Sequence, residues 1–328
     1  MTLPLLPTTG VGSFPKPNNS KTAKGTLDET SKKATQDFIK KQEELGIDVL
    51  VDGEFYCADM ATDYGRALGL PIANWTRSYG NRFWRKLIVD KNLADVEKKP
   101  IRLEQFLYAQ KLTIKPVKGM LTGPTTLANW GFNNFYKTRE DLVLAWADII
   151  KHEAEQLEKN GAKYIQIDEP AVGERHWEKE LFKEAMKRVT QNLKAYTITH
   201  ICYGNFVAVY DTIKHTAINQ VDIELANELD LGKNSNLLAM MKEDRLTKYK
   251  DVAIGVIDVR PGVDVETTHQ VKKRIYTALD ILAPTDALLK KIWIKPDCGF
   301  RTTKNQDVAY AKMATMMEAV RQVREELK

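Results

Sequence analysis

The strongest constraint on the fold is the regular alternation of short apolar runs with longer amphipathic segments. Runs rich in Val, Ile and Leu recur eight times, and most are followed by a stretch with helical periodicity. Such alternation is typical of a parallel sheet whose strands are joined by helices. We therefore expect strands at 5–11, 47–53, 114–121, 162–168, 195–202, 220–225, 251–259 and 291–297.

Eight strands of this kind predict an α/β fold, specifically a (β/α)₈ TIM barrel. A doubly wound open sheet is the alternative that the same pattern permits. Segment 55–113 is too long for a simple crossover, so we expect an insertion between strands 2 and 3. The sequence has no internal repeat and no linker rich in Pro, Gly or Ser, which favours a single domain over residues 1–328.

The charge and cysteine content limit the class of protein. The 49 basic and 44 acidic residues give a net charge of +5, too small an excess to indicate a nucleic-acid surface. No apolar run reaches the roughly 18 residues of a membrane span, and "MTLPLLPTTGVGSFPKP" lacks the basic region of a signal peptide. Three cysteines, an odd number, argue against a disulfide framework. We expect a cytoplasmic protein without a membrane or nucleic-acid partner.

Polar residues gather where the predicted strands end. The active site of a barrel is built from the loops at the carboxyl ends of its strands. Reading those ends in order gives Gly12, Ser13, Glu54, Thr122, Gly123, Asp168, Glu169, His200, Cys202, Glu224, Asp258, Asp297 and Cys298. A buried core would not select this set, so we expect a reactive site at this end of the barrel.

Four of these residues have the chemistry of metal ligands. His200 and Cys202 are two positions apart, so in a strand both side chains point to the same side. Glu224 and Cys298 can reach that side from the sixth and eighth strands. A set of His, Cys, Glu and Cys fits a tetrahedral zinc site. Cys57 has no such neighbours in the sequence, and we interpret it as a packed core thiol.

The charge of this ligand set indicates the reaction. Two thiolates and a carboxylate offset the zinc charge by three and leave a formal charge of about −1 on the site. A metal in that state activates water poorly, which makes a zinc hydrolase the less favoured interpretation. It can bind a substrate thiol, lower its pKa and keep the sulfur electron-rich. The site therefore favours alkylation of a thiol over hydrolysis.

The ordered motifs of the chain resemble one known family. They are "GVGSFPKP", "VDGEF", "TRSYGNR", "LTGPTTLANW", "IQIDEPA", "HICYGNF", "DIELAN", "RPGVDV" and "KPDCGF". Together they resemble the catalytic half of cobalamin-independent methionine synthase along nearly the whole chain. The resemblance implies a homocysteine S-methyltransferase of amino-acid biosynthesis that forms L-methionine. It implies the zinc ligands His200, Cys202, Glu224 and Cys298, with the substrate thiolate as the nucleophile and no nucleophile from the protein.

The resemblance also implies the residues that bind the substrates. For homocysteine these are Gly12 and Ser13, whose main chain could hold the carboxylate, and Glu54 and Asp168, which suit the ammonium group. On the side of the methyl donor, the matching positions are Arg82, Trp130 and Glu174. The residue after that arginine departs from the family, since Phe83 stands where the family has cysteine.

Two departures from the family bear on the methyl donor. Longer members carry a second barrel, for which 328 residues leave no room, and the family's proton-transferring histidine falls on Thr267. His269 lies nearby but out of register. A folate amine needs protonation as it leaves, and general-acid help of that kind is worth about 10² to 10⁴ in rate.

Because cob(I)alamin leaves without protonation, we expect a methylcobamide donor, either methylcobalamin or a methylated corrinoid protein. Such a protein would dock over the barrel mouth, with the aromatic and basic stretch 75–85 as part of its surface. 5-Methyltetrahydrofolate is the alternative donor. A non-catalytic relative that binds thiols or metal is the alternative from another class.

Overall fold

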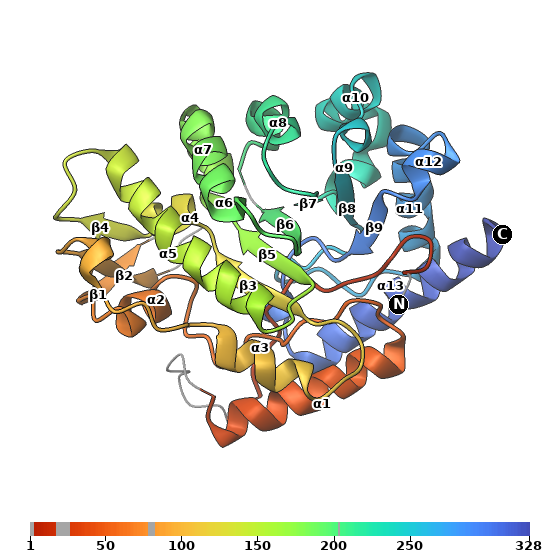
Figure 1. Cartoon of the computed structure of the whole chain (residues 1–328). Coiled ribbons are helices and arrows are strands. Elements are labelled where there is room, and N and C mark those ends of the chain that lie inside the picture. Colours follow the sequence, from red (N-terminus) through yellow and green to blue (C-terminus); the bar gives the residue numbers. More distant parts are fainter. Residues whose placement is uncertain (1–2, 18–26, 78–82, 203) are drawn as a thin grey trace.

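The centre of the molecule is a parallel sheet that curves into a barrel (Figure 1). The computed structural model describes residues 3–17, 27–77, 83–202 and 204–328. Within these ranges, six parallel strands pair in the order β3-β5-β6-β7-β8-β9. They are β3 (Lys118–Thr122), β5 (Tyr164–Asp168), β6 (Tyr196–Ile201), β7 (Gln220–Ile223), β8 (Asp251–Gly255) and β9 (Ile292–Lys295).

Two short extended segments close this sheet into a complete barrel. The parallel bridges are Thr8 to Ile294, Thr9 to Val49, and Leu50 to Val117. The segments around 8–9 and 49–50 therefore occupy the places of the first two predicted strands. The predicted (β/α)₈ barrel is confirmed, and the doubly wound alternative is wrong, because an open sheet would leave β3 and β9 as unpaired edges.

Helices cover the outside of the barrel, and their ends follow local sequence signals (Figure 1). Helix α1 (Glu29–Leu45) begins after Asp28, whose side chain accepts a hydrogen bond from the Ser31 N–H at 2.7 Å, and ends at Gly46 with φ 84°. The others are α2 (Thr62–Ala67), α3 (Leu103–Gln110), α4 (Pro124–Asn129), α5 (Arg139–Lys159), α6 (Pro170–Glu174), α7 (Lys179–Thr190), α8 (Phe206–Lys214), α9 (Ala226–Leu231), α10 (Asn236–Glu243), α11 (Thr268–Leu282), α12 (Asp286–Leu289) and α13 (Gln306–Glu326).

A second, smaller sheet lies beside the barrel. Strands β1 (Ile72–Arg77) and β2 (Phe83–Val89) form an antiparallel pair within the 55–113 stretch. Strand β4 (Gly131–Asn133), from beyond β3, then pairs with β2 in parallel. On this sheet Trp75 is exposed and the Arg85 guanidinium lies 5.4 Å from the centre of its ring. The stretch therefore packs partly on a segment that follows the third barrel strand.

The interior of the barrel changes from aromatic to polar along its axis. Tyr164, Tyr196 and Trp293 contact one another near the amino ends of their strands, with ring centres 5.6 to 5.9 Å apart. Further along, the buried Lys118 ammonium donates to the Gly10 carbonyl at 2.6 Å and to the side chain of Gln166. Charged side chains thus begin inside the barrel, well below the mouth.

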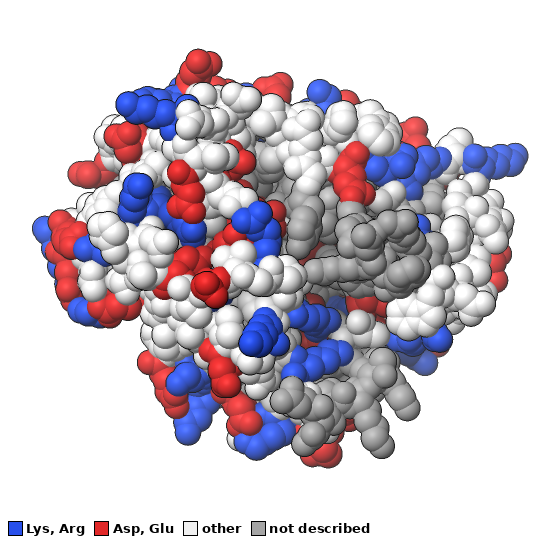
Figure 2. Space-filling model, turned by 180° about the vertical axis from the view of Figure 1, so that it is seen from behind, with Lys and Arg blue, Asp and Glu red and all other residues white. Residues whose placement is uncertain are grey.

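The surface carries both signs of charge. On the face shown in Figure 2, basic and acidic side chains are interspersed. Among the described residues, no helix combines the length and the apolar character needed to cross a membrane.

Candidate functional site

The strand ends bring three of the four predicted metal ligands together. His200 lies in β6, Cys202 follows that strand directly, and Cys298 follows β9. Ligand atoms of these three side chains all lie within 4.8 Å of one another. Since β6 and β9 are not neighbours in the sheet, the curvature of the barrel makes this convergence possible.

The electrostatic state of the cluster suits a cation. Burial, with the nearby ammonium groups of Lys295 and Lys118, lowers the pKa of His200 well below its usual value, so the ring is neutral. A hydrogen bond with Cys298 raises the pKa of the Cys202 thiol, and burial and the charge of Glu224 raise it further. Two thiols that are hydrogen-bonded to each other beside a neutral imidazole are a donor set that binds zinc once their protons leave.

The hydrogen bonding of His200 gives a direct test of whether a metal fits. The side chain is 2% exposed, and within the described part of the chain neither ring nitrogen has a hydrogen-bond partner. Buried polar atoms are rarely left without a partner in native proteins. A metal held with the two thiols would satisfy one of these nitrogens, so the residues present fit the expected zinc.

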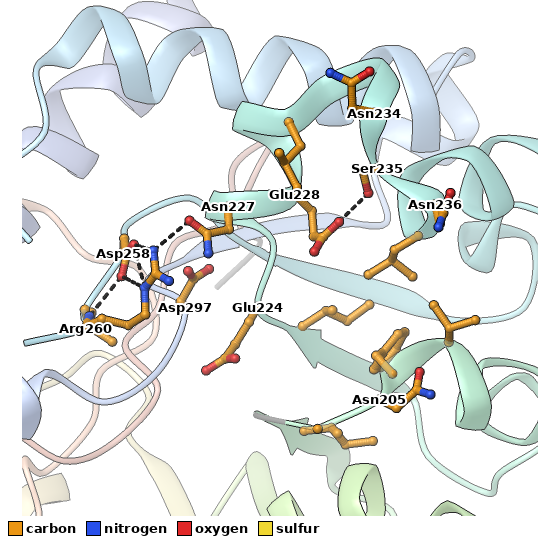
Figure 3. A pocket seen from close by; sticks show the side chains of 18 residues that line it. Asn205, Glu224, Asn227, Glu228, Asn234, Ser235, Asn236, Asp258, Arg260 and Asp297 are labelled. Carbon is orange, nitrogen blue, oxygen red and sulfur yellow. Dashed lines mark hydrogen bonds and ion pairs between the residues drawn. The ribbon is translucent and has the colours of Figure 1, made fainter. Parts of the chain in front are cut away.

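Glu224 lies outside this three-residue cluster. It follows β7 and lines a cleft of about 600 Å³ between the β7 and β8 ends and the α9–α10 segment. Figure 3 shows its side chain extending from the end of β7, away from Asn234 and Asn236 on the far wall. Its carboxylate is near enough to raise the pKa of Cys202. The fourth predicted ligand is thus adjacent to the cluster.

Asp297 connects the two segments that carry Glu224 and Cys298. Its Oδ1 accepts hydrogen bonds from the Leu225 N–H at 3.0 Å and the Ala226 N–H at 3.1 Å. Burial raises the pKa of this carboxyl to about 6. One buried side chain therefore fixes the turn after Glu224 to the residue that precedes Cys298.

The residues predicted to bind homocysteine lie around a narrow pocket beside this cluster. Glu54 and Asp168 both line it, together with Thr122 and Met120. Burial raises the pKa of both carboxyls, and the charge of Glu54 raises that of Asp168 further. Two carboxylates that repel each other across a pocket provide a site for one cation, such as the ammonium of an amino acid.

The backbone around Glu54 is held in an uncommon conformation. Glu54 has φ 50°, a left-handed value that few residues other than glycine adopt, and it follows Gly53 with φ 82°. The Arg301 guanidinium donates to the Glu54 carbonyl at 2.6 Å, and the Glu54 N–H donates to Asp52 at 2.9 Å. Such strained residues concentrate at binding and active sites.

Gly12 and Ser13 lie between this pocket and the turn that carries Cys298. A side chain at Gly12 would collide with the carboxylate of Glu54, and one at Gly299 would collide with Ser13 Oγ. Glycine at position 12 therefore lets the main chain approach the pocket closely. The predicted carboxylate-binding turn thus lies next to the predicted ammonium-binding pair.

Of the three residues predicted on the donor side, the structure does not bring the two that it describes together in one pocket. Arg82 lies outside the described residues. Trp130 is buried against the apolar core at the end of α4, whereas Glu174 is exposed at the end of α6. Thr267, at the position of the family histidine, caps the start of α11, and its side chain accepts from the Gln270 N–H.

Several polar residues around the site were not predicted from the sequence. Gln166 Nε2 donates to Asp168 Oδ1 at 2.7 Å and to the Val11 carbonyl at 2.8 Å, which orients that carboxylate. Arg102, buried among aromatic rings, also lines the pocket that contains Glu54 and Asp168. A polar residue inside an apolar strand, as in "YIQID", was the available signal for Gln166. Arg102 had no local signal.

Comparison with known proteins finds a family model, relatives and solved structures that match this chain. The family model described as "Cobalamin-independent synthase, Catalytic domain" matches residues 6–322. A protein of Pyrococcus abyssi named methionine synthase is 32% identical over 341 residues, which is 100% of this chain and 95% of that protein. A solved structure of a B12-independent methionine synthase from Shewanella sp. W3-18-1, in complex with selenomethionine, has a TM-score of 0.81 at 25% identity, covering 98% of this chain and 99% of that one.

Other relatives are about twice as long. The 5-methyltetrahydropteroyltriglutamate–homocysteine methyltransferase of Bacillus licheniformis is 34% identical over 349 residues, which is 99% of this chain but only 44% of that protein. The chain therefore spans less than half the length of such relatives. The predicted homocysteine methyltransferase agrees with the names of these proteins.

The predicted methyl donor is wrong. Relatives are named for a methyltetrahydropteroyl-glutamate donor, and the family model is named as cobalamin-independent, so neither a methylcobamide nor a corrinoid protein partner is supported. The leaving-group argument required the proton-donating acid to stand at one position, which Thr267 occupies. That requirement was too narrow, because general-acid help is worth only about 10² to 10⁴ in rate, so its absence at one position does not exclude a folate donor.

The resemblance noted in the sequence motifs is confirmed over nearly the full chain by the family model and by relatives of matching length. The chain belongs to the family of the cobalamin-independent synthase catalytic domain.

Proposed function

We propose that this protein is a zinc-dependent homocysteine methyltransferase that forms L-methionine with a folate-type donor, a 5-methyltetrahydropteroyl-glutamate. The observation that carries the proposal is the buried cluster of His200, Cys202 and Cys298 with an imidazole that lacks hydrogen-bond partners among the described residues. The names of the relatives supply the methyl donor. The paired carboxylates beside the cluster match an α-amino acid that carries a thiol.

In this proposal His200, Cys202 and Cys298 hold zinc, with Glu224 as the fourth ligand from the adjoining cleft. The bound metal would supply the positive charge that lowers the pKa of the substrate thiol. Its ligand charge, two thiolates and a carboxylate, keeps the sulfur nucleophilic. The protein provides no nucleophile of its own.

The remaining residues position the substrate. Glu54 and Asp168 receive the ammonium group, which would relieve the repulsion that raises the pKa of Asp168. The main chain at Gly12 and Ser13 receives the carboxylate. The methyl group then passes from N5 of the donor to the sulfur, the thiol proton having already left, and the departing amine takes up a proton. Arg82, Trp130 and Glu174 remain our candidates for contacts to the donor.

We also propose that residues 1–328 form one domain with 55–113 as an insertion. The pairing of β2 with β4 supports this, because it joins the insertion to a segment between β3 and α5. A reducing compartment, the cytoplasm, suits the three free cysteines, since oxidation of Cys202 or Cys298 would prevent metal binding.

The first experiment measures zinc and methionine together. The purified protein should contain about one zinc per chain, and Cys298→Ser and His200→Ala should lose most of it. Cys57→Ser, which removes the third cysteine outside the cluster, should keep its zinc. Activity without any bound metal, or equal zinc loss in all three variants, would contradict the proposed site.

The second experiment identifies the reaction. With homocysteine and 5-methyltetrahydropteroyltriglutamate, or its monoglutamate form, the protein should release methionine. Glu54→Gln should weaken homocysteine binding measured by calorimetry while the zinc content stays unchanged. Uptake of homocysteine without methionine from either donor would instead identify a non-catalytic thiol-binding protein.

A further inference from the structure

Both ring nitrogens of His200 are buried without a hydrogen-bond partner among the described residues, and a bound metal would satisfy only one of them. If zinc binds with Cys202 and Cys298 as proposed above, it satisfies one ring nitrogen. The other carries the proton of the neutral ring and remains buried, because the side chain is 2% exposed. A buried N–H without an acceptor loses its hydrogen bond to water without replacement, and such groups are rare in native proteins. An acceptor for the second nitrogen is therefore expected close by.

Asp222 carries a buried oxygen that also lacks a partner. Its side chain is fully buried, and its Oδ1 accepts from Gln220 Nε2 at 2.7 Å. Its Oδ2 has no hydrogen-bond partner within the part of the chain that the structure describes. The carboxylate oxygen lacks a donor and the imidazole N–H lacks an acceptor, so one hydrogen bond between them would satisfy both.

The register of the sheet places these two groups side by side. His200 of β6 and Asp222 of β7 are directly paired positions in adjacent parallel strands. Paired positions project their side chains to the same side of the sheet, and adjacent strands lie about 4.8 Å apart. Rotation of either side chain about its χ angles can therefore bring the ring nitrogen to Oδ2.

The other groups around His200 are less suitable as acceptors. Asp168 is paired with His200 on the opposite side, but its Oδ1 already accepts from Gln166, and it faces the homocysteine pocket. Lys118 and Lys295, whose charges act on the imidazole, are donors only. Lys118 also lies near enough to Asp222 to compensate the charge of a buried carboxylate.

We propose that Asp222 is a positioning residue that accepts a hydrogen bond from the His200 ring nitrogen facing away from the two thiols. This bond fixes the tautomer of the ring and directs the lone pair of the other nitrogen toward the metal. Asp222 acts through His200 and touches neither substrate.

Zinc affinity of the folded protein tests the proposal. In competition with a chromophoric chelator, Asp222→Ala should bind zinc about 10- to 100-fold more weakly than the unsubstituted protein. Asp222→Asn should lose less, because its amide oxygen still accepts a hydrogen bond. The matched control is Asp251→Ala, which removes another carboxylate from the barrel, one that accepts from the Tyr196 hydroxyl, and which should leave zinc affinity unchanged.

A double substitution separates positioning from a general effect on folding. In a His200→Ala background, Asp222→Ala should cause no further loss of zinc affinity, because the donor of the hydrogen bond is gone. Nitrogen NMR of the histidine ring in the zinc-loaded protein should show one tautomer with Asp222 present and a mixture in Asp222→Ala. The same further loss in the His200→Ala background, or an equal loss in Asp251→Ala, would overturn the proposal. Zinc content and methionine formation of the unsubstituted protein test the proposed function separately.

Discussion

Substitution of Asp297 should show how much the backbone around the site, as distinct from the proposed metal ligands, contributes to stability. Its carboxylate is 8% exposed and accepts two backbone N–H groups, from Leu225 and Ala226, both fully buried. In Asp297→Ala both N–H groups lose this acceptor. Each buried N–H left without a partner costs about 1–3 kcal/mol, so the variant should lose about 2–6 kcal/mol of unfolding free energy.

Two further substitutions show whether the loss of unfolding free energy comes from these two hydrogen bonds. Asp297→Asn keeps an oxygen with two lone pairs in the same position, so we expect it to remain within about 1 kcal/mol of the unsubstituted protein. Asp258→Ala removes another carboxylate at the mouth, which accepts one backbone N–H, that of Arg260 at 2.9 Å, and pairs with the half-exposed Arg260 guanidinium, so we expect a smaller loss than in Asp297→Ala.

Urea unfolding of the zinc-free protein, followed by circular dichroism, measures these differences. A total stability of about 5–15 kcal/mol leaves room to resolve them. Asp297→Ala should also weaken zinc binding, because the turn after Glu224 loses its anchor. Equal unfolding free energies for Asp297→Ala and Asp258→Ala would refute the assignment of the two hydrogen bonds as the link between these segments.

Three other substitutions test features of the same mouth. Burial raises the pKa of Glu169 to about 7 from 4.5, so its contribution to stability is full below pH 4.5 and is lost as the pH rises through 7. Glu169→Gln, which lacks this titration, should gain up to about 3 kcal/mol relative to the unsubstituted protein between pH 4.5 and 7, and parallel unfolding curves would contradict this. Gly204→Ala should cost at least about 2 kcal/mol, because the backbone has φ 82° and the new Cβ would lie 2.5 Å from the Gly173 carbonyl carbon; Gly161→Ala, also left-handed but with open space, should cost only about 1 kcal/mol. Asp168→Asn should unfold at a higher temperature than the unsubstituted protein at pH 7, with the gap closing toward pH 4, because burial and Glu54 raise the pKa of Asp168; homocysteine binding should weaken in the same variant.

The barrel was predictable from the sequence because its signals are local. Apolar runs marked all eight strand positions, and the two-residue spacing of His200 and Cys202 placed both side chains on the inner face. The first two predicted strands form only isolated bridges in the structure. Their length could not be predicted, because it depends on the partner strands rather than on their own residues. The same limit applies to β4, which pairs with β2 from a distant part of the sequence.

The contacts within the site were less predictable, because they depend on side-chain conformation. The spacing "VDIEL" placed Glu224 at the correct strand end but could not show that its carboxylate lies beside the three-residue cluster. The left-handed backbone of Glu54 and the two hydrogen bonds of Asp297 arise only when loops from different strands meet. The methyl-donor prediction was wrong because the absence of a second barrel and of a histidine at position 267 was given too much weight.

The bridge between Thr8 and Ile294 joins two segments that are far apart in the sequence. During synthesis, β3, β5 and β6 acquire their partners early, while the segment around Thr8 keeps one side unpaired until β9 has left the ribosome. An unpaired strand side is a site of intermolecular association, so this interval is the vulnerable stage of folding. Cys298 comes shortly after β9, so it can reach Cys202 only once β9 is in place. Closure of the barrel and completion of the thiol pair are therefore expected to be one late event of folding.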